Sequence, residues 1–256
     1  MKYLACVSGG KDSNAQVIVG REHNEPIDGI VYSEVMFDKD ISGELPEHRE
    51  FMYNVAIPKF ESMGYKVTVL RAEETYVDRF FRVKQKGERK GQIYGFPPTG
   101  MCWVNSDLKM KPIREFWKNF PEEFTQYVGI AMNEEERLDR IVDAGNKVSL
   151  LKKYEVVENA TYGICRKKGL LSPVYDFSKR NGCWFCPNQS LDQLRHLRKV
   201  HPQLWKRLME LQEVSPHPFK VQCPMQQLEH RFYWESQQFN MFDTYYDYNI
   251  LQKGGR

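Results

Sequence analysis

The sequence predicts an α/β fold, a doubly wound parallel sheet followed by a C-terminal helical extension that contains cysteines. Three short apolar or β-branched runs, at residues 3–7, 27–32 and 65–70, are typical of buried strands. Helix-compatible segments separate these runs, and this alternation indicates parallel strands joined by right-handed crossovers. A chain of 256 residues is long enough for one large domain or two small ones.

The turn between the first predicted strand and the helix after it has the composition of an anion-binding site. Gly9 and Gly10 let the backbone turn tightly and approach phosphate oxygens, because neither residue has a Cβ. The helix start supplies unpaired N–H groups and the positive end of a helix dipole. We therefore predict a phosphate-binding loop over residues 8–13. Its hydroxyl-bearing and charged members are Ser8, Lys11, Asp12 and Ser13.

The second predicted strand, residues 27–32, is followed by Ser33. Open α/β sheets bind ligands beyond the carboxyl ends of their strands, so Ser33 is a candidate site residue. A long helix is predicted to begin near Glu44 and to lead back to the third strand, residues 65–70. Its expected buried side chains are Phe51, Val55, Ile57 and Phe60.

The second half of the chain continues the pattern with fewer strands. A short apolar run at residues 127–130 predicts another strand, and the acids at residues 133–136 are typical of a helix start. An amphipathic pattern predicts a helix over residues 158–168. Residues 191–211 have helical periodicity, and Pro202 divides them into two helices because proline favours a first turn.

Composition excludes several classes of protein. Hydrophobic residues make up 41% of the chain and the formal net charge is only +3, which indicates a globular protein rather than a disordered one. The N-terminus lacks the pattern of a signal peptide, and no apolar run approaches the ~20 residues of a membrane span. We expect a soluble, cytoplasmic protein without membrane contact, whose six cysteines are reduced. Reduced cysteines favour metal binding or catalysis over disulfides.

Cys183 and Cys186 have the spacing of a metal-binding or redox pair, because two intervening residues let both sulfurs face one centre. Pro187 follows at once, as it often does after an iron–sulfur ligand. These residues alone leave three alternatives open: an iron–sulfur cluster, a structural zinc site and two unligated core thiols. Cys165 lies on the apolar side of a predicted helix, where a cysteine is more often a core residue than a ligand.

Two segments concentrate positive charge. Residues 79–91 contain the single acid Glu88 among six basic residues, and residues 195–207 contain no acid. The first segment is predicted to be a loop over the site, and the second forms the outer face of the two C-terminal helices. Each is either solvated surface or a contact for the phosphates of a nucleotide or a nucleic acid.

The loop sequence SGGKDS, residues 8–13, lacks the spacing of a Walker motif or of a dinucleotide fingerprint. It resembles the signature of the PP-loop ATP pyrophosphatase superfamily. The resemblance implies a Rossmann-like fold of the adenine nucleotide alpha hydrolase type, with ATP and Mg²⁺ as ligands. In that superfamily the loop surrounds the β and γ phosphates, the α phosphate is attacked and pyrophosphate leaves. The implied catalytic residues are Lys11, Asp12 and Ser13, and the implied nucleotide contacts also include Ser8, Gly9, Gly10 and Ser33.

Two further stretches, residues 101–112 and 170–211, are similar to the phosphoadenosine phosphosulfate reductases and their relatives. In the first stretch Cys102 is followed by a Leu-Lys pair that ends at Lys109. By this resemblance Lys109 meets the nucleotide. Arg137, which follows the strand at residues 127–130, is implied to do the same.

The same relatives suggest a metal centre. Their iron–sulfur forms place a cysteine element ahead of a Cys-x-x-Cys pair, so the resemblance implies that Cys102 binds metal together with Cys183 and Cys186. Cys165 is the nearer candidate for a fourth ligand, and Cys223 is the other. The implied centre is a 4Fe-4S cluster, with Zn²⁺ as the alternative.

The resemblance implies an enzyme that hydrolyses ATP to AMP and pyrophosphate and so adenylylates an acceptor for sulfur incorporation. The acceptor would be a nucleic acid, either the DNA backbone in phosphorothioation or a tRNA base in thiolation. A sulfur donor such as a cysteine desulfurase is expected, as is a homo-oligomer or a place in a modification complex. We expect a nucleotide-binding domain over residues 1–178, with the Cys-x-x-Cys and helical region, residues 179–256, packed on it.

Two alternatives remain. A sulfonucleotide (PAPS or APS) reductase would use a nucleophilic cysteine near its C-terminus, and residues 248–256 contain none. A non-catalytic nucleotide-binding subunit of a larger complex would keep the loop and leave the chemistry to a partner.

Overall fold

The computed structural model describes residues 1–98, 102–142, 145–221 and 223–237. Its centre is a five-stranded sheet in the order β3-β2-β1-β4-β5, in which every neighbouring pair is parallel. The predicted parallel α/β fold is therefore confirmed. The strands are β1 (Lys2–Val7), β2 (Gly29–Ser33), β3 (Lys66–Leu70), β4 (Phe124–Val128) and β5 (Lys147–Val148).

The direction in which successive strands are added reverses at β1. From β1 the chain adds β2 and β3 on one side, and it then returns to add β4 and β5 on the other. β1 and β4 are neighbours in register, with Cys6 opposite Val128. Ligands of open α/β sheets bind in the crevice at such a reversal, beyond the carboxyl ends of the strands. The loop after β1 lies at this point.

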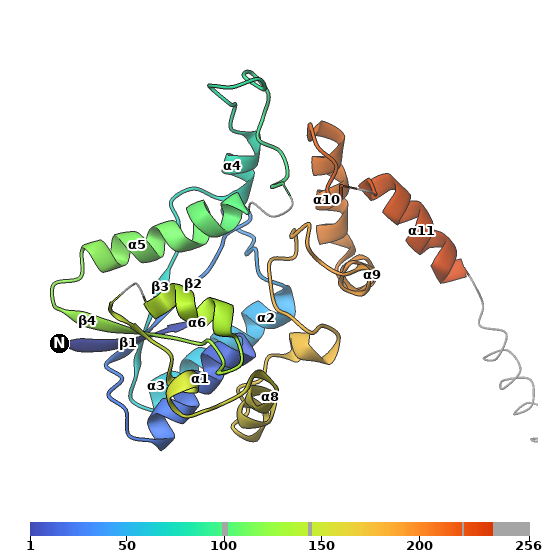
Figure 1. Ribbon diagram of the computed structural model, residues 1–256. Coiled ribbons are helices and arrows are strands. Elements are labelled where there is room, and N and C mark those ends of the chain that lie inside the picture. Colours follow the sequence, from blue (N-terminus) through green and yellow to red (C-terminus); the bar gives the residue numbers. More distant parts are fainter. Residues whose placement is uncertain (99–101, 143–144, 222, 238–256) are drawn as a thin grey trace, which may run out of the picture.

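Helices cover both faces of the sheet. α5 (Lys111–Lys118) lies on one face, and α1 (Lys11–Glu22) and α8 (Glu158–Lys167) lie on the other (Figure 1). One hydrophobic cluster joins α1 and α8 to the central strands, with Val17, Tyr32 and Cys165 among its buried members. The remaining elements before residue 180 are α2 (Pro46–Phe51), η1 (Met52–Ala56), α3 (Ile57–Ser62), α4 (Tyr76–Phe81), η2 (Val104–Met110), α6 (Glu135–Val142), α7 (Leu150–Lys153) and η3 (Pro173–Asp176).

The single helix predicted between β2 and β3 is divided into α2, the π-helical η1 and α3. Proline has no N–H and its ring clashes with the preceding turn, so Pro58 in the first turn of α3 does not continue a regular α-helix. The extra residue of the π turn rotates the face that points inward. Met52 and Ala56 are therefore buried, whereas the predicted core residue Val55 is 40% exposed, and that prediction was wrong.

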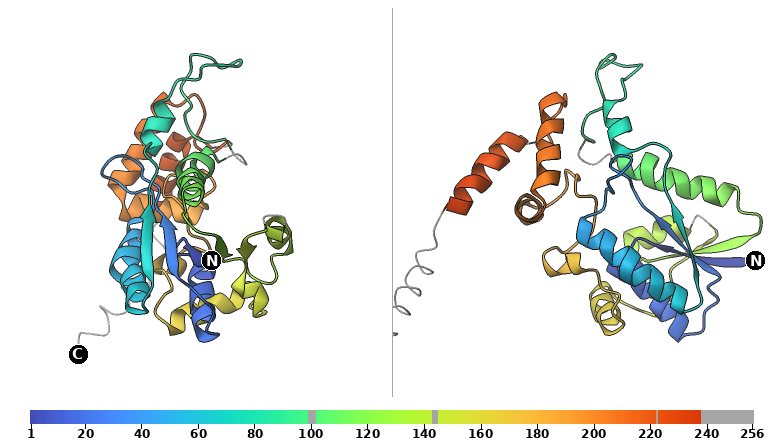
Figure 2. Two further views of the ribbon diagram at one scale, coloured as in Figure 1. Left: turned by 90° about the vertical axis from the view of Figure 1, so that its left-hand side faces the viewer. Right: turned by 180° about the vertical axis from the view of Figure 1, so that it is seen from behind.

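The C-terminal part consists of α9 (Leu191–Val200), α10 (Pro202–Val214) and α11 (Met225–Gln237), and Pro202 separates α9 from α10 as predicted. These helices stand beyond the carboxyl ends of the strands rather than in either helical layer, as Figure 2 shows from behind. None of the helices in the described ranges is long and apolar enough to cross a membrane.

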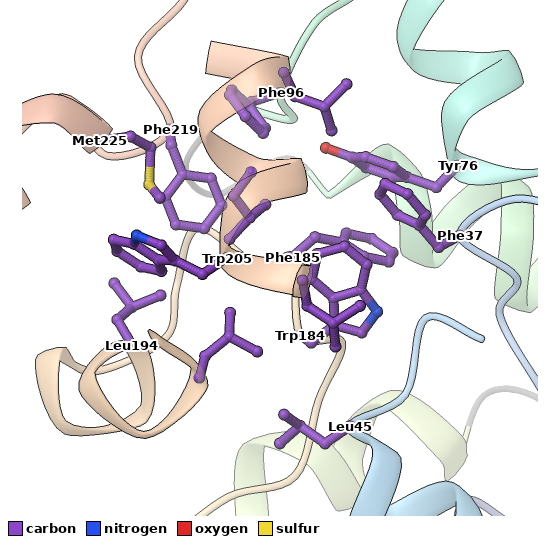
Figure 3. Close-up of a cluster of buried hydrophobic side chains, with 14 of the residues drawn as sticks. Phe37, Leu45, Tyr76, Phe96, Trp184, Phe185, Leu194, Trp205, Phe219 and Met225 are labelled. Atoms are coloured by element: carbon purple, nitrogen blue, oxygen red, sulfur yellow. The ribbon is translucent and has the colours of Figure 1, made fainter. Parts of the chain in front are cut away.

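A second hydrophobic cluster ties the C-terminal helices to the rest of the protein. Phe185 lies against the ring of Tyr76 at 3.9 Å between centroids, and Trp184 packs on Phe37 at 4.5 Å. Figure 3 shows these rings beside Trp205 of α10. The aromatic residues next to the Cys-x-x-Cys pair thus fix that pair against the segments that follow β2 and β3.

Candidate functional site

The predicted phosphate loop connects β1 to α1 and depends on glycine at two close approaches. Gly9 has a φ of +73°, and a Cβ there would lie 2.5 Å from Cε1 of His48. Gly129, just after β4, packs directly on the loop, so its Cβ would lie 2.7 Å from the backbone N of Ser13. The strand end and the loop therefore meet with no side chain between them.

The start of α1 leaves backbone donors free for an anion. Gly10 is its N-cap and has no side chain to cap the first turn; the Lys11 N–H donates to the Tyr175 hydroxyl, and the next N–H groups, of Asp12 and Ser13, have no side-chain acceptor among the described residues. The two serines hold the loop itself, since the Ser8 N–H donates to Ser13 Oγ (3.1 Å) and this hydroxyl donates to the Gly10 carbonyl (2.9 Å). Uncapped N–H groups and the helix dipole make this end of α1 suitable for phosphate.

Lys11 supplies a buried positive charge to the same place. Only 3% of its surface is exposed, and its Nζ donates to Asp12 Oδ1 (2.8 Å) and to Glu158 Oε1 (2.8 Å). Although burial lowers the pKa of Lys11, hydrogen bonds to these two carboxylates outweigh it and raise that pKa. Thr161 fixes Asp12 by donating to Oδ1 at 2.8 Å. The ammonium group is therefore charged at neutral pH and is held by acids that a triphosphate would have to replace.

His48 supports the loop from below, and sequence reasoning missed it. Its ring is fully buried, with Nε2 3.0 Å from the Ser8 carbonyl and Nδ1 3.0 Å from Ser172 Oγ. Burial lowers the pKa of His48, so the ring is neutral. Nε2 also lies 2.8 Å from Nδ2 of Asn181, so the buried ring joins three separate segments of the chain. A single histidine in a helix carries no local signal of such a role.

Tyr175 is a second support that the sequence did not reveal. Its hydroxyl accepts a hydrogen bond of 3.0 Å from the Lys11 N–H, and a Cβ on Gly10 would lie 3.3 Å from that oxygen. Tyr175 belongs to η3, which lies within the stretch that resembles the reductase relatives. The loop is thus held by a residue that lies 164 positions later in the sequence.

The other predicted nucleotide contacts divide into two groups. Ser33, buried at the end of β2, donates to the backbone carbonyl of Lys109 at 3.2 Å. Burial lowers the pKa of His48, and the Lys109 ammonium lowers it further. Burial raises the pKa of Cys183, and the same ammonium partly counteracts that rise. The Lys109 ammonium therefore lies near both His48 and Cys183. Arg137 is half exposed on α6, where it pairs with Glu134.

Cys102, Cys183 and Cys186 lie near enough for their thiols to affect one another's ionisation, although the three sulfurs are not all within 4.8 Å of one another. Burial, the Glu44 carboxylate and the neighbouring thiols of Cys186 and Cys102 raise the pKa of Cys183 well above its usual range. Burial and the same three thiols raise the pKa of Tyr76 in the same way. Thiols in this position resist ionisation, and a bound cation would reverse that preference.

Cys165 is not part of this group. It lies in α8 under the loop, where its thiol donates to the Lys11 carbonyl at 3.1 Å, and burial raises its pKa to about 12. Cys223 packs on the same hydrophobic cluster as Cys183. Both Cys186 and Cys223 act on Lys220, whose pKa burial lowers and whose Nζ donates to the Gln189 carbonyl at 2.7 Å. Of the two candidates for a fourth ligand, Cys223 is therefore the one near the other cysteines.

The first basic segment forms one wall of a pocket of about 510 Å³. Its Arg89 lies 3.0 Å from Nε2 of His217, and the Arg79 guanidinium lies 4.1 Å from the centre of the Tyr94 ring. Trp103, next to Cys102 in the chain, lines the same pocket. The other lining residues are Lys84, Tyr94, Pro97, Pro98, Pro218, Phe219 and Val221. A pocket with cationic and aromatic walls suits a planar, negatively charged ligand.

The second basic segment offers less free charge. Arg195 pairs with Glu235 at 2.6 Å, and Arg198 pairs with Glu229 at 2.7 Å. Both acids belong to α11, which packs beside α10. In the segment at residues 79–91, Arg79 and Arg82 also pair with acids, Asp107 and Glu74, but its other four basic residues pair with no acid of the described residues. That segment therefore has more free positive charge and is the better candidate for phosphate contacts.

Comparison with known proteins found similarity to solved structures. No family model matches the chain, and none of the curated proteins does. The chain is similar to the U34-tRNA thiolase NcsA from Methanococcus maripaludis with its 4Fe-4S cluster, at 13% sequence identity and a TM-score of 0.42. The similarity covers 83% of this chain and 71% of that one. At this level of likeness, function has to be argued from the site.

Proposed function

We propose that this chain is an ATP pyrophosphatase that converts ATP to AMP and pyrophosphate in order to adenylylate an acceptor. The observation that carries the proposal is the loop at residues 8–13. It sits where the strand order reverses, and it combines a helix start whose N-cap is glycine with the buried, charged Lys11. Its sequence is also the one that resembles the PP-loop signature.

The residues of the loop suit the release of pyrophosphate. The N–H groups at the start of α1 and the Lys11 ammonium would hold the β and γ phosphates and stabilise the charge that develops on the leaving group. Asp12, which Lys11 would release, is a carboxylate able to hold Mg²⁺ beside those phosphates. When bound, the ion would neutralise part of the triphosphate charge.

The cysteines suggest that the acceptor receives sulfur. Four ligands around one zinc ion at about 2.3 Å would put the sulfurs roughly 3.8 Å apart. The sulfurs of Cys102, Cys183 and Cys186 are not all within 4.8 Å of one another. A cluster with several irons spaces its ligands more widely, so we propose a 4Fe-4S cluster here, with Cys223 as the fourth candidate. The Lys109 ammonium acts electrostatically on Cys183 of this group and on His48 beside the loop.

The acceptor that fits best is a nucleic acid, either tRNA or DNA. The cationic and aromatic pocket next to Cys102 would take an unstacked base and its phosphates. Sulfur would come from a donor such as a cysteine desulfurase, and the protein would act as a homo-oligomer or as a subunit of a modification complex.

The test is to identify the products of ATP labelled at the α or at the γ phosphate. AMP and pyrophosphate are expected from the wild type, and Lys11→Ala should form neither. Lys199→Ala, on the surface of α9, is the matched control and should retain activity. ADP and phosphate as products would reject the mechanism. Absence of turnover with intact ATP binding would favour the non-catalytic subunit, and turnover of a sulfonucleotide without ATP would favour the reductase.

A further inference from the structure

Glu47, His196 and His201 come together at the junction between the α/β part and the C-terminal helices. Nε2 of His196 lies 3.1 Å from Glu47 Oε1, and Nε2 of His201 lies 2.8 Å from the same oxygen. Among the residues that the structure describes, no other group of histidines, cysteines and acids brings three ligand atoms within 4.8 Å of one another. Each of the three side chains is at least three-quarters buried, with 12–25% of its surface exposed.

A second feature of this group points to a ligand. Glu47 Oε2 is buried, and no described residue lies within hydrogen-bond reach of it. An unpaired carboxylate oxygen away from water costs free energy, and the penalty is removed when a cation binds.

The two rings are also held for coordination. His196 stacks on Phe177 at 3.7 Å between ring centres, with only 12° between the planes, so its ring direction is fixed by packing. His201 lies between α9 and α10, where it is the C-cap of α9 and the N-cap of α10. Both histidines therefore present Nε2 to the same point in space.

We propose that Glu47, His196 and His201 form a binding site for a divalent transition metal, best suited to zinc, that joins α2 to α9 and α10. Two imidazole nitrogens and one carboxylate oxygen are ligands that zinc prefers, and a water molecule would complete four-coordination. Binding through Nε2 requires each ring to carry its proton on Nδ1, so the two hydrogen bonds to Glu47 would be replaced by metal bonds. The site is separate from the cysteines and does not depend on the proposed ATP chemistry.

The position of the site gives it a structural role. Glu47 directly precedes His48, which supports the phosphate loop through the Ser8 carbonyl. The metal would therefore fix the C-terminal helices to the same short helix that carries the loop support. Without metal, Glu47 is joined to His196 and His201 by two hydrogen bonds, which solvent can replace more easily than metal bonds.

The experiment uses the full chain, stripped of metal with a chelator and then titrated with Co²⁺ and with Zn²⁺. Cobalt bound by thiolates gives intense near-ultraviolet charge-transfer absorption, whereas cobalt bound by nitrogen and oxygen gives only weak visible bands, so the two kinds of site are distinguished in one protein. The variants are Glu47→Gln, which keeps the shape and one acceptor oxygen, and the His196→Gln/His201→Gln double variant. His230→Gln on α11 is the matched control.

The wild type and the control are expected to bind one equivalent without thiolate absorption, and both test variants should lose that equivalent. Zinc should raise the Tm of the wild type, and this increment should be absent from the variants. Imidazole ¹⁵N spectra of the wild type need no substitution and should show zinc-dependent shifts of Nε2 in His196 and His201. Unshifted imidazoles in the presence of zinc, or the same stoichiometry in a folded Glu47→Gln variant, would overturn the proposal.

Discussion

The ammonium nitrogen of Lys11 lies 2.8 Å from Oε1 of Glu158, although 147 residues separate the two side chains along the sequence. Asp12 holds the same nitrogen at 2.8 Å. Lys11 is thus neutralised before any ligand arrives, and a triphosphate must take it from two carboxylates. The acids would therefore set part of the affinity for the proposed nucleotide.

Glu158→Gln is expected to tighten ATP binding. The substitution removes a competitor for Lys11 and a negative charge beside the triphosphate, while Asp12 still holds the ammonium group. Because Glu158 is partly exposed, we expect an effect of about 0.5–1 kcal/mol, which is a two- to fivefold lower Kd. Glu61→Gln, an exposed acid on α3, serves as the control. Calorimetric titration with Mg²⁺ present measures both, and weaker binding by Glu158→Gln would contradict this account.

Gly129→Ala and Gly163→Ala should have opposite effects on stability. A Cβ on Gly129 would lie 2.7 Å from the backbone of Ser13, so the loop must shift, at a cost on the order of 1–3 kcal/mol and with loss of ATP binding. Gly163 lies in α8 with open space around it, so alanine there should stabilise the protein by roughly 0.5–1 kcal/mol. Urea unfolding and ATP titration of both variants provide the comparison. Equal stabilities would show that the loop does not need the close contact.

The Cys183→Ser/Cys186→Ser double variant should lose the metal centre and, with it, part of the stability of the protein. Cys165→Ser is expected to retain the metal, because Cys165 contacts the loop rather than the other cysteines. Cys223→Ser should weaken retention if Cys223 is the fourth ligand. Iron, sulfide and zinc are measured on protein purified without oxygen. Full metal content in the double variant, or its loss in Cys165→Ser alone, would refute the assignment.

Stability should fall as pH drops below about 6.5, in part through His48. Burial keeps the pKa of His48 below that of an unfolded histidine, so in this range the unfolded state binds a proton that the folded state does not. Its contribution is complete above the unfolded pKa and is lost towards lower pH, with a slope of up to about 1.4 kcal/mol per pH unit. His48→Gln, whose amide N–H reaches the Ser8 carbonyl, should lack this component. Urea unfolding at several pH values measures the difference, and identical slopes in both proteins would exclude it.

Reversing the charges of Arg82, Lys84 and Lys86 should weaken binding of nucleic acid without changing ATP hydrolysis in its absence. Each lost phosphate contact should reduce the salt dependence by roughly 0.7–0.9 log units per decade of salt. Reversal of Arg195 and Arg198 is the control, because acids on α11 already neutralise both. Titrations with tRNA and duplex DNA at two salt concentrations decide the point. Undetectable binding by the wild type would favour a small-molecule substrate.

Local features of the sequence were sufficient for the sheet and the loop. The runs at residues 3–7, 27–32 and 65–70 became β1, β2 and β3, since strand pattern and flanking turns are local properties. The run at residues 127–130 became β4 a few residues earlier, at Phe124–Val128. β5 has two residues, Lys147–Val148, and is too short for any periodic signal.

The supports of the site required the structure. His48 and Tyr175 reach the loop because separate segments fold onto it, and no spacing in the sequence encodes those contacts. The cysteines give the same lesson: Cys165 is nearer in sequence to Cys183, yet α8 packs under α1 and carries it away from the group, while the more distant Cys223 lies beside it.

The long reach of the contacts that hold the phosphate loop has a consequence for biosynthesis. β1 and the loop are made before β2 to β5, and Glu158, Ser172 and Tyr175 are made only after both sheet halves. A nascent chain that ends before these residues can pair β1 with β2 and β3, yet Lys11 lacks one of its acids and Ser8 lacks the braced His48. Contacts between such distant segments also slow folding, since long loops must close first. The full set of contacts around the loop can therefore form only after Tyr175 has been made.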